Sequence, residues 1–424
     1  MDTIFALSSG RPPAAVAVVR ISGPRAHDAG KRMAGSLPDP RAAAVRELRH
    51  FASGELLDQA LVLRFDSPAS STGEDVVEFH CHGGRAVVDA VLATLGSLDG
   101  LRAAEPGEFT RRAFENGRMD LTEAEGLADL IEAETESQRK SALALAEGGL
   151  RKQIDEWQTR LLRLSAEAEQ KIDYDEDDLA VGPALARGCA CLAEELREWL
   201  DRPRVEPLKD GVRVVIAGAP NAGKSSLINI IAGSERAIVT EVPGTTRDHI
   251  EVPLSLAGVP ILLTDTAGLR ATDDPVEAIG VGRAAALAKA ADVLVWLGEP
   301  GEAPEHPRLI PVHAKVDLPD RLKQPPGSLP LSSVTGEGVQ ALVEKIGALA
   351  TSLLPGEGAV ALNRRQAERI EEAAAALESA AAAVDGVLAA EDLRQARGAF
   401  DRLTGRAGVE DLLDALFGRF CLGK

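Results

Sequence analysis

One loop of this 424-residue chain has the residues needed to hold the phosphates of a nucleotide. In Gly218–Ser225 (Gly-Ala-Pro-Asn-Ala-Gly-Lys-Ser), the glycines let successive backbone N–H groups turn toward phosphate oxygens. Lys224 could reach the outer phosphates, and the Ser225 hydroxyl could bind Mg²⁺. An apolar run, Val212–Ala217, precedes the loop, and a helix-like run, Ser226–Ile231, follows it, so a helix N-terminus adds positive charge. The pattern predicts a nucleoside triphosphate site.

Further segments follow this loop in the order used by P-loop proteins that hydrolyse nucleotides. They are Gly244–Asp248, Asp265–Gly268, Ala314–Asp317 and Ser332–Val334. The Thr246 hydroxyl could complete the Mg²⁺ shell, the Asp265 carboxylate could hold the metal through water, and the Gly268 N–H could meet the γ-phosphate. The ordered set is far more specific than any one of its members.

Asp317 predicts which base is bound. A carboxylate accepts hydrogen bonds from the N1–H and the exocyclic amine of guanine, and adenine offers no such pair, so GTP is favoured over ATP. Ala314 departs from the usual pattern, because GTPases usually have Asn at this position, where its amide ties this loop to the phosphate loop.

The hydrolytic water needs an orienting group that the usual position does not supply. Ras-like proteins have Gln directly after Asp-x-x-Gly, and this chain has Leu269, which can neither donate nor accept a hydrogen bond. The acidic segment Asp273–Glu277 lies just downstream. It is either a solvated acidic loop or the source of a carboxylate that orients water or acts as a general base.

Hydrophobic periodicity divides the chain into four parts. Residues 1–118 predict an α+β domain with strands at 16–19, 61–63 and 76–79 and a helix at 86–95. Residues 119–208 and 353–424 predict helices, and residues 209–352 predict an α/β domain, because the near-continuous apolar runs 212–217, 261–263 and 293–297 are typical of a parallel sheet covered on both faces. We therefore expect an α/β domain inserted into a helical bundle whose two halves pack on each other.

Two details of the helical parts are predicted from spacing. Thr122–Glu125 fits a capping box. Apolar residues at helical spacing predict buried faces in each half: Leu150, Ile154, Trp157, Leu161 and Leu164 in the first, and Ile370, Leu377, Ala381, Val384 and Leu388 in the second.

Charge and cysteine usage bound the protein's environment. The formal net charge of −19 argues against a surface that wraps nucleic acid, so any nucleic acid would need a local basic patch or a basic partner. Four cysteines in a chain of this length do not indicate a disulfide framework, so we expect a reduced, cytoplasmic protein. The sequence has no signal pattern and no long apolar span, so we expect no membrane segment.

The order of motifs and both ends of the chain resemble the MnmE (TrmE) family of tRNA modification GTPases. Outside the nucleotide motifs, the resemblance depends on Asp2–Ile4, Arg20–Gly23, Thr72–Glu78, His82–Gly84, Glu105–Thr110, Arg112–Leu121 and the tail Phe420–Lys424. It implies a cytoplasmic homodimer joined through N-terminal domains that bind a tetrahydrofolate derivative (5-formyl- or methylene-). It also implies an FAD-dependent partner of the MnmG (GidA) type, a heterotetramer with that partner, and aminomethyl-type modification at C5 of the wobble uridine of certain tRNAs, with folate supplying the carbon.

The resemblance also implies roles for particular residues. Potassium-dependent dimerisation of G domains would activate hydrolysis, with K⁺ held by Asn221, Thr240, Val242 and Thr245, Mg²⁺ by Ser225 and Thr246, and with Glu277 as the catalytic glutamate. Folate would contact Arg20, Glu78, Arg118 and Lys424, and Cys421 would act in the tail, with a half-buried structural cysteine as the alternative. The predicted GTP-binding set is Asn221, Ala222, Gly223, Lys224, Ser225, Ser226, Thr240, Glu241, Val242, Pro243, Gly244, Thr245, Thr246, Asp265, Thr266, Ala267, Gly268, Lys315, Asp317, Ser332 and Ser333.

Other interpretations are weighed against this one. A ribosome-assembly or stress-signalling GTPase switch would need neither a folate pocket nor a tail thiol. A folate enzyme with a degraded G domain conflicts with the intact residues Lys224, Ser225, Thr246 and Asp265. His80-Cys81-His82 is not interpreted as a metal site, because in a strand Cys81 faces away from both histidines.

Overall fold

The structure is a computed structural model of the chain. It describes residues 2–174, 180–219, 221–234, 236–237, 251–256, 258–265, 286–321, 323–356, 359–407, 410–418, 420 and 423. The chain forms two compact units, one of Met1–Ala128, Arg151–Asp155 and Arg397–Lys424, the other of Asp129–Leu150 and Glu156–Ala396. The predicted boundaries after residues 118, 208 and 352 remain predictions.

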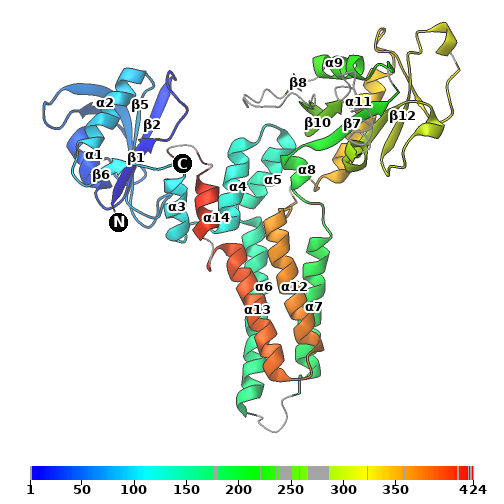
Figure 1. Cartoon of the computed structure of the whole chain (residues 1–424). Coiled ribbons are helices and arrows are strands. Elements are labelled where there is room, and N and C mark those ends of the chain that lie inside the picture. The colour runs from blue at the N-terminus through cyan, green and yellow to red at the C-terminus, as the bar shows by residue number, and fades with distance from the viewer. Residues whose placement is uncertain are drawn as a thin grey trace, which may run out of the picture. The chain divides into compact units, whose positions relative to one another are not determined.

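The first unit contains a six-stranded sheet in the order β3-β4-β5-β2-β1-β6 (Figure 1). Its strands are β1 (Thr3–Leu7), β2 (Val16–Ser22), β3 (Ala43–Arg49), β4 (Leu56–Phe65), β5 (Val76–His82) and β6 (Leu101–Ala103). Helices α1 (Ala26–Ala34) and α2 (Arg85–Gly96) pack on the sheet. The three predicted strands and the predicted helix are confirmed, and β1, β3 and β6 were missed because they are short or mostly solvent-facing.

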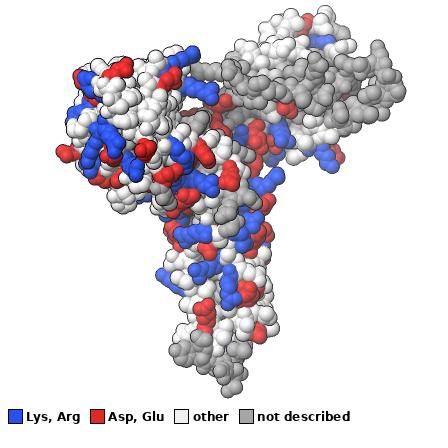
Figure 2. Space-filling view, turned by 60° about the vertical axis from the view of Figure 1, so that its left-hand side comes forward, with Lys and Arg blue, Asp and Glu red and all other residues white. Residues whose placement is uncertain are grey.

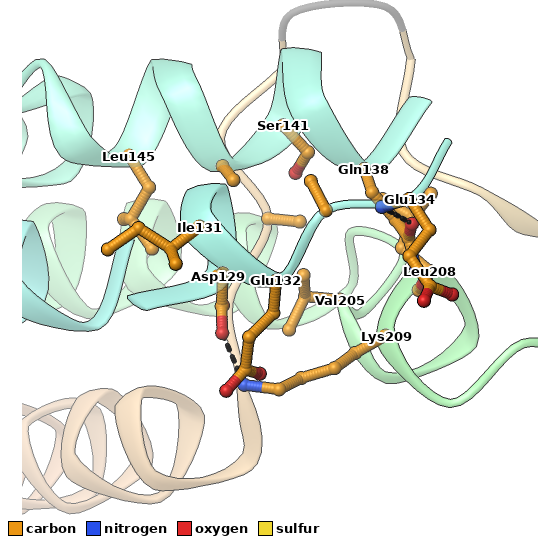
Figure 3. Close-up of a pocket in the computed structure, with 13 residues that line it drawn as sticks. Asp129, Ile131, Glu132, Glu134, Gln138, Ser141, Leu145, Val205, Leu208 and Lys209 are labelled. Carbon is orange, nitrogen blue, oxygen red and sulfur yellow. Dashed lines mark hydrogen bonds and ion pairs between the residues drawn. The ribbon is translucent and has the colours of Figure 1, made fainter. Parts of the chain in front are cut away.

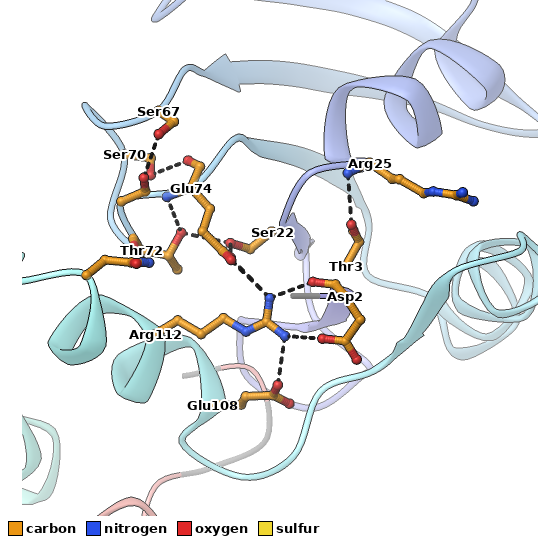
Figure 4. Close-up of polar contacts among 12 residues, drawn as sticks. Asp2, Thr3, Ser22, Arg25, Ser67, Ser70, Thr72, Glu74, Glu108 and Arg112 are labelled. Carbon is orange, nitrogen blue, oxygen red and sulfur yellow. Dashed lines mark hydrogen bonds and ion pairs between the residues drawn. The ribbon is translucent and has the colours of Figure 1, made fainter.

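A buried arginine joins distant segments of this unit. Arg112 lies on α3 (Glu108–Glu115), and its side chain is only 7% exposed. Its guanidinium donates to the Asp2 carboxylate at 2.7 Å, to Glu108 at 3.0 Å and to Glu74 at 3.2 Å (Figure 4). Glu74 in turn accepts from the Ser22 hydroxyl at 2.7 Å. The N-terminus, β2, the loop before β5 and α3 are therefore held by one charged centre.

The capping box predicted at Thr122–Glu125 is wrong by two residues. Helix α4 (Leu121–Glu132) begins after Asp120, whose carboxylate accepts from the Glu123 N–H at 2.9 Å. The Glu123 carboxylate accepts in return from the Asp120 N–H at 2.7 Å. Thr122 lies in the first turn and donates to Asp120 instead. The carboxylate at the earlier position captures the free N–H groups before Thr122 can.

Long helices form much of the second unit. They are α5 (Glu136–Ala146), α6 (Gly149–Tyr174), α7 (Pro183–Leu200), α12 (Arg364–Ala382) and α13 (Gly386–Thr404). The first unit takes residues 151–155 of α6, the end of α13 from residue 397, and α14 (Glu410–Phe417). Helix α7 packs along α12, where Arg197 pairs with Glu371 and Glu378 at 2.5 and 2.7 Å. The two predicted helical blocks therefore do pack on each other.

The predicted buried faces hold for most of one block and fail for part of the other. Leu150, Ile154, Trp157 and Leu161 on α6 are buried, and Leu164 is half-buried. Val384 is 83% exposed, because α12 ends at Ala382 and a new helix begins at Gly386, which changes the phase of the pattern. Leu388, 58% exposed, is on the outer face of that new helix.

A seven-stranded sheet lies between α7 and α12 in the sequence, in the order β13-β12-β11-β7-β10-β9-β8. Its strands are β7 (Val212–Gly218), β8 (Arg236–Ala237), β9 (Glu251–Leu256), β10 (Val259–Asp265), β11 (Val293–Leu297), β12 (Leu309–Ala314) and β13 (Leu329–Leu331). The predicted parallel core is confirmed, since β10, β7, β11, β12 and β13 are parallel neighbours. Helices α9 (Lys224–Ser234) and α11 (Val339–Leu353) pack against this sheet.

Within the described residues no helix has the length and apolar character to cross a bilayer.

Replacing Arg112 with Met should lower the free energy of opening of β5 by about 3–5 kcal/mol, because Glu74, just before β5, would stay buried without its charged partner. Hydrogen exchange of β5 peptides measures this. Arg111→Met, which removes a side chain that is 38% exposed, should cost less than about 1 kcal/mol. Similar losses in both variants would contradict the role given to Arg112.

The stabilisation of the fold by Arg112 should depend on pH. Burial alone would raise the pKa of Glu108, but hydrogen bonds from Arg102, the Glu105 backbone and Arg112 outweigh it and hold the pKa below its usual value of 4.5. A carboxylate with a lowered folded-state pKa stabilises the fold above the unfolded pKa, and this stabilisation is lost as the pH falls through the folded one. The difference between wild type and Arg112→Met should therefore shrink below about pH 4.5.

Candidate functional site

The phosphate loop is built as predicted, between β7 and α9. Gly218 has φ +146°, and a Cβ there would lie 2.4 Å from the Leu297 carbonyl oxygen at the end of β11. Gly223 has φ +97° and Asn221 has φ +59°, so the loop passes repeatedly through left-handed backbone conformations. Glycine is required at Gly218 by both the space and the conformation. The loop therefore curls tightly where parallel strands end.

Lys224 and Ser225 begin helix α9. The Lys224 side chain is buried and donates from Nζ to the carbonyl oxygens of Gly218 and Ala219, at 3.1 and 2.8 Å. The ammonium group therefore lies over the loop, at the helix N-terminus that favours anions. This is the place where a phosphate group would gain most from a fixed positive charge.

The Ser225 hydroxyl donates to the Asp265 carboxylate at 2.6 Å. Asp265 ends β10, which pairs in parallel with β7 so that Asp265 lies opposite Ile216. A hydroxyl and a carboxylate at this spacing are hard oxygen donors of the kind that Mg²⁺ prefers, so these two residues fit the ion in its first or water-mediated shell. The structure thus brings together two residues 40 positions apart in the sequence.

The predicted base-binding residues also meet. The Ser332 hydroxyl donates to the Asp317 carboxylate at 2.6 Å and accepts from the Val334 and Thr335 N–H groups, both at 3.1 Å. Lys315, between β12 and Asp317, has φ +64°. One oxygen of Asp317 is therefore fixed in direction, which suits a carboxylate that must receive two parallel donors.

The structure describes only some of the remaining residues of the predicted nucleotide site. Ala222, Ser226 and Ser333 are described, and a Cβ added at Gly223 would lie 3.9 Å from the Ser333 hydroxyl, so the phosphate loop and the base loop are close. Ala314 is buried and offers no side-chain amide. Several predicted residues lie outside the described residues: Thr240, Glu241, Val242, Pro243, Gly244, Thr245, Thr246, Thr266, Ala267, Gly268, Glu277, Cys421 and Lys424.

A second candidate site lies on the sheet of the first unit. Arg20 on β2 and Glu78 on β5 are direct cross-strand partners, and Arg20 Nε donates to Glu78 at 2.8 Å. The Arg20 guanidinium also lies 5.6 Å from the centre of the Phe109 ring. Glu78 is 14% exposed, so its carboxylate is available at a largely covered position. Arg118 is exposed, and its side chain packs beside Gly73 on the loop before β5.

The C-terminal tail reaches the end of β1. Gly423 has φ +94°, and a Cβ there would lie 1.9 Å from the Leu7 carbonyl oxygen. Only glycine permits this approach of two backbones. No pattern in the sequence indicated that this tail contacts Leu7.

Cys81 does not form a metal site with its neighbours. It is buried in β5, and burial, followed by the charge of Asp58, raises the pKa of its thiol to about 12. His82 Nδ1 lies 2.7 Å from Asp58, and His80 Nε2 lies 3.3 Å from Glu78. The two histidines thus have carboxylate partners on the face away from Cys81, as expected for a strand.

A hollow of about 580 Å³ lies where the helices lead into the nucleotide-binding sheet (Figure 3). Ile131, Leu145, Val205 and Leu208 supply apolar lining, and Lys209 pairs with Asp129 at the rim. Gln138, on α5, donates to the Leu208 carbonyl oxygen at 2.9 Å. Leu208 lies on the short helix α8 (Glu206–Lys209), which directly precedes β7, so α5 is hydrogen-bonded to the entry of the sheet.

Two family models match this chain. The one described as "MnmE helical domain" matches residues 121–421, and the one described as "GTP-binding protein TrmE N-terminus" matches residues 3–118. Among curated proteins, the "tRNA modification GTPase MnmE" of Erythrobacter litoralis is 53% identical over 427 residues, and that of Novosphingobium aromaticivorans is 52% identical over 435 residues. Both alignments cover 100% of each chain. Among solved structures, the G domain of the T. maritima FeoB iron transporter is 28% identical over 33% of this chain and 98% of that one, with a TM-score of 0.25.

Alkylation should distinguish the described thiols. At pH 8, iodoacetamide should modify exposed Cys191 much faster than Cys81 or Cys189, because burial raises the pKa of the latter two thiols to about 12 and about 11. Peptide mapping of the native chain measures the rates, and urea-unfolded chain provides the control in which all sites react. Labelling of native Cys81 at the rate of Cys191 would contradict the buried position.

Proposed function

This chain belongs to the MnmE family of tRNA modification GTPases, and from that premise we propose that it uses GTP hydrolysis to drive modification of wobble uridines. It is a GTPase of tRNA modification. The observation that carries the proposal is the 2.6 Å contact of Ser225 with Asp265 beside Lys224, on a chain related over its full length to such enzymes. The match of residues 3–118 to the family's N-terminal model favours this function over a ribosome-assembly or stress-signalling switch.

The residues of the phosphate loop can divide the work of hydrolysis. Lys224 and the backbone N–H groups of the loop bind and orient the phosphates, and Ser225 with Asp265 would hold Mg²⁺, which neutralises charge on the transferring phosphoryl group. Asn221, Thr240, Val242 and Thr245 would hold K⁺ when two G domains associate. Asn221 lies within the phosphate loop, and this position supports its role beside the phosphates. Glu277 would position the attacking water, since Leu269 cannot.

Arg20 and Glu78 support the folate site. A carboxylate that is mostly covered and held by an arginine can accept two hydrogen bonds from the amidine-like edge of a pterin. Arg118 and Lys424 would pair with the acidic end of the ligand, and Cys421 would stand nearby. The bound tetrahydrofolate (5-formyl- or methylene-) would supply one carbon. The approach of Gly423 to the Leu7 backbone supports a role for the tail at this domain.

The remaining partners follow from the family. We expect a cytoplasmic homodimer that binds tRNA and forms a heterotetramer with an FAD-dependent partner of the MnmG type. The hydrogen bonds of α5 support a mechanical role for the nucleotide: Ser137 donates to the Gly258 carbonyl oxygen at 2.7 Å, and Gly258 directly precedes β10, which ends at Asp265. A change at Asp265 could therefore reach the helices through α5.

Glu277→Ala should lower potassium-stimulated GTP hydrolysis by about 100-fold or more and leave nucleotide affinity unchanged, because it removes the group that orients water and no group that binds phosphate. Single-turnover hydrolysis with K⁺ or Na⁺, together with binding of a fluorescent guanine nucleotide, measures both quantities. Asp273→Ala, in the same acidic segment, is the matched control. Stimulated turnover that survives in Glu277→Ala would refute the assignment.

Mass spectrometry of tRNA nucleosides tests the whole function. Cells lacking this chain should lose the aminomethyl-type groups at wobble uridines, and the wild-type gene should restore them. Glu78→Gln should fail to restore them while keeping GTP turnover, because the neutral amide presents a donor where the pterin edge needs a second acceptor. Unchanged nucleosides in the deletion strain would favour a switch GTPase instead.

A further inference from the structure

The turn between β3 and β4 presents two stacked aromatic rings. The His50 and Phe51 rings are 5.3 Å apart and nearly parallel, with 9° between their planes. Phe51 is 39% exposed, although a phenyl ring gains by burial. His50 Nδ1 accepts from the Ala52 and Ser53 N–H groups at 3.3 and 3.2 Å, which fixes the imidazole in this orientation. The pair is therefore a rigid, accessible π surface.

Arginines surround this pair. A hollow of about 540 Å³ is lined by Arg32 from α1, by Arg46 and Arg49 from β3, and by both rings, with Glu47 as its acidic member. Arg46 bonds to the Ser36 oxygens and the Val45 carbonyl, and within the described part of the chain no carboxylate neutralises it. The hollow thus carries a net positive charge.

The two other arginines can exchange their partners. Arg32 pairs with Asp28 at 3.0 Å and Arg49 with Glu47 at 2.7 Å, and all four side chains are about half exposed. Exposed ion pairs of this kind contribute little, so a phosphate group could replace the carboxylate at small cost. Arginine offers such a group two parallel N–H donors.

The distribution of charge along the chain singles out this region. Residues 31–50 carry five Lys and Arg against two Asp and Glu, and residues 1–118 carry 14 against 15. The remaining chain carries 33 against 51 and would repel a polyanion. On the face seen in Figure 2, Lys and Arg side chains lie on the N-terminal part with Asp and Glu among them. Electrostatic attraction therefore favours nucleic-acid binding at this region over the rest of the chain.

We propose that the hollow formed by Arg32, Arg46, Arg49, His50 and Phe51 binds an unpaired nucleotide of an RNA loop, with the base stacked on the ring pair and flanking phosphates on the arginines. Aromatic side chains with nearby arginines recognise single-stranded RNA in this way, because every base has a π face and every linkage a charge. Duplex RNA has its bases already stacked and would gain only the charge. The inference rests on the proposed function, which makes tRNA the RNA concerned.

Fluorescence anisotropy with a labelled anticodon stem–loop RNA tests this on the full-length chain. Arg46→Glu combined with Arg49→Glu should weaken binding at least about tenfold and reduce the salt slope by about 1.4, from two lost phosphate contacts. Phe51→Ala should weaken binding about tenfold with the salt slope unchanged. Arg139→Glu, at a similarly exposed arginine on α5, should bind as wild type. GTP turnover should be unchanged in every variant, and Arg46→Gln with Arg49→Gln replaces the charge reversal if that variant folds poorly.

Three binding results would overturn the proposal: no RNA binding by the wild-type chain, unchanged affinity in the arginine and Phe51 variants, or equal affinity for a duplex of the same length. Dissociation of the homodimer by the variants would also overturn it, because this face would then be a contact between copies of the chain. The proposed function fails separately, if wobble uridines are unchanged in cells lacking the chain. RNA binding that depends on this hollow would stand in that case.

Discussion

Parallel pairing of β7 with β10 and β11 is the constraint on which the nucleotide site depends. Parallel strands end at the same edge of a sheet, so the loop after β7 and the carboxylate that ends β10 must meet. Helix α9 then begins where the loop ends and directs its N-terminus at the same point. The contact between Ser225 and Asp265 is a consequence of strand register, and a slip by one residue would turn Asp265 to the other face of the sheet.

In the N-terminal unit, charged side chains bring distant segments together. Its sheet is mostly antiparallel, so Arg20 and Glu78, the residues proposed to contact folate, lie on a face of the sheet as a cross-strand pair. Arg112 then joins the N-terminus, the loop before β5 and α3 through the carboxylates of Asp2, Glu74 and Glu108, of which the last two are largely covered. A buried charge centre of this kind is stable only when it is complete, and completing it fixes the segments that carry it.

Net charge also differs between the N-terminal part and the rest of the chain. The nucleotide-binding part and the helices are strongly acidic, and the phosphate loop offers a phosphate ligand the N-terminus of α9 and the buried Lys224. The N-terminal part is nearly neutral and has its arginines grouped with aromatic rings. A protein whose total charge repels nucleic acid can still meet RNA at one place, because screening confines the field of each patch to about 10 Å.

The parallel α/β core, the phosphate loop and the residue types of the nucleotide site were predictable from sequence. They depend on local spacing: apolar runs, glycines at the turn, and Lys-Ser at a helix start. The sequence also predicted the pairing of the two helical blocks, since neither could bury its apolar face alone. It misplaced the cap at Asp120 and the exposed Val384, where one side chain or a short break between helices decides the phase. Only the tertiary structure revealed the Arg112 centre, the approach of Gly423 to Leu7 and the ring pair among arginines. These join residues far apart in the chain or depend on which side of an edge strand faces water, and no local period records such contacts.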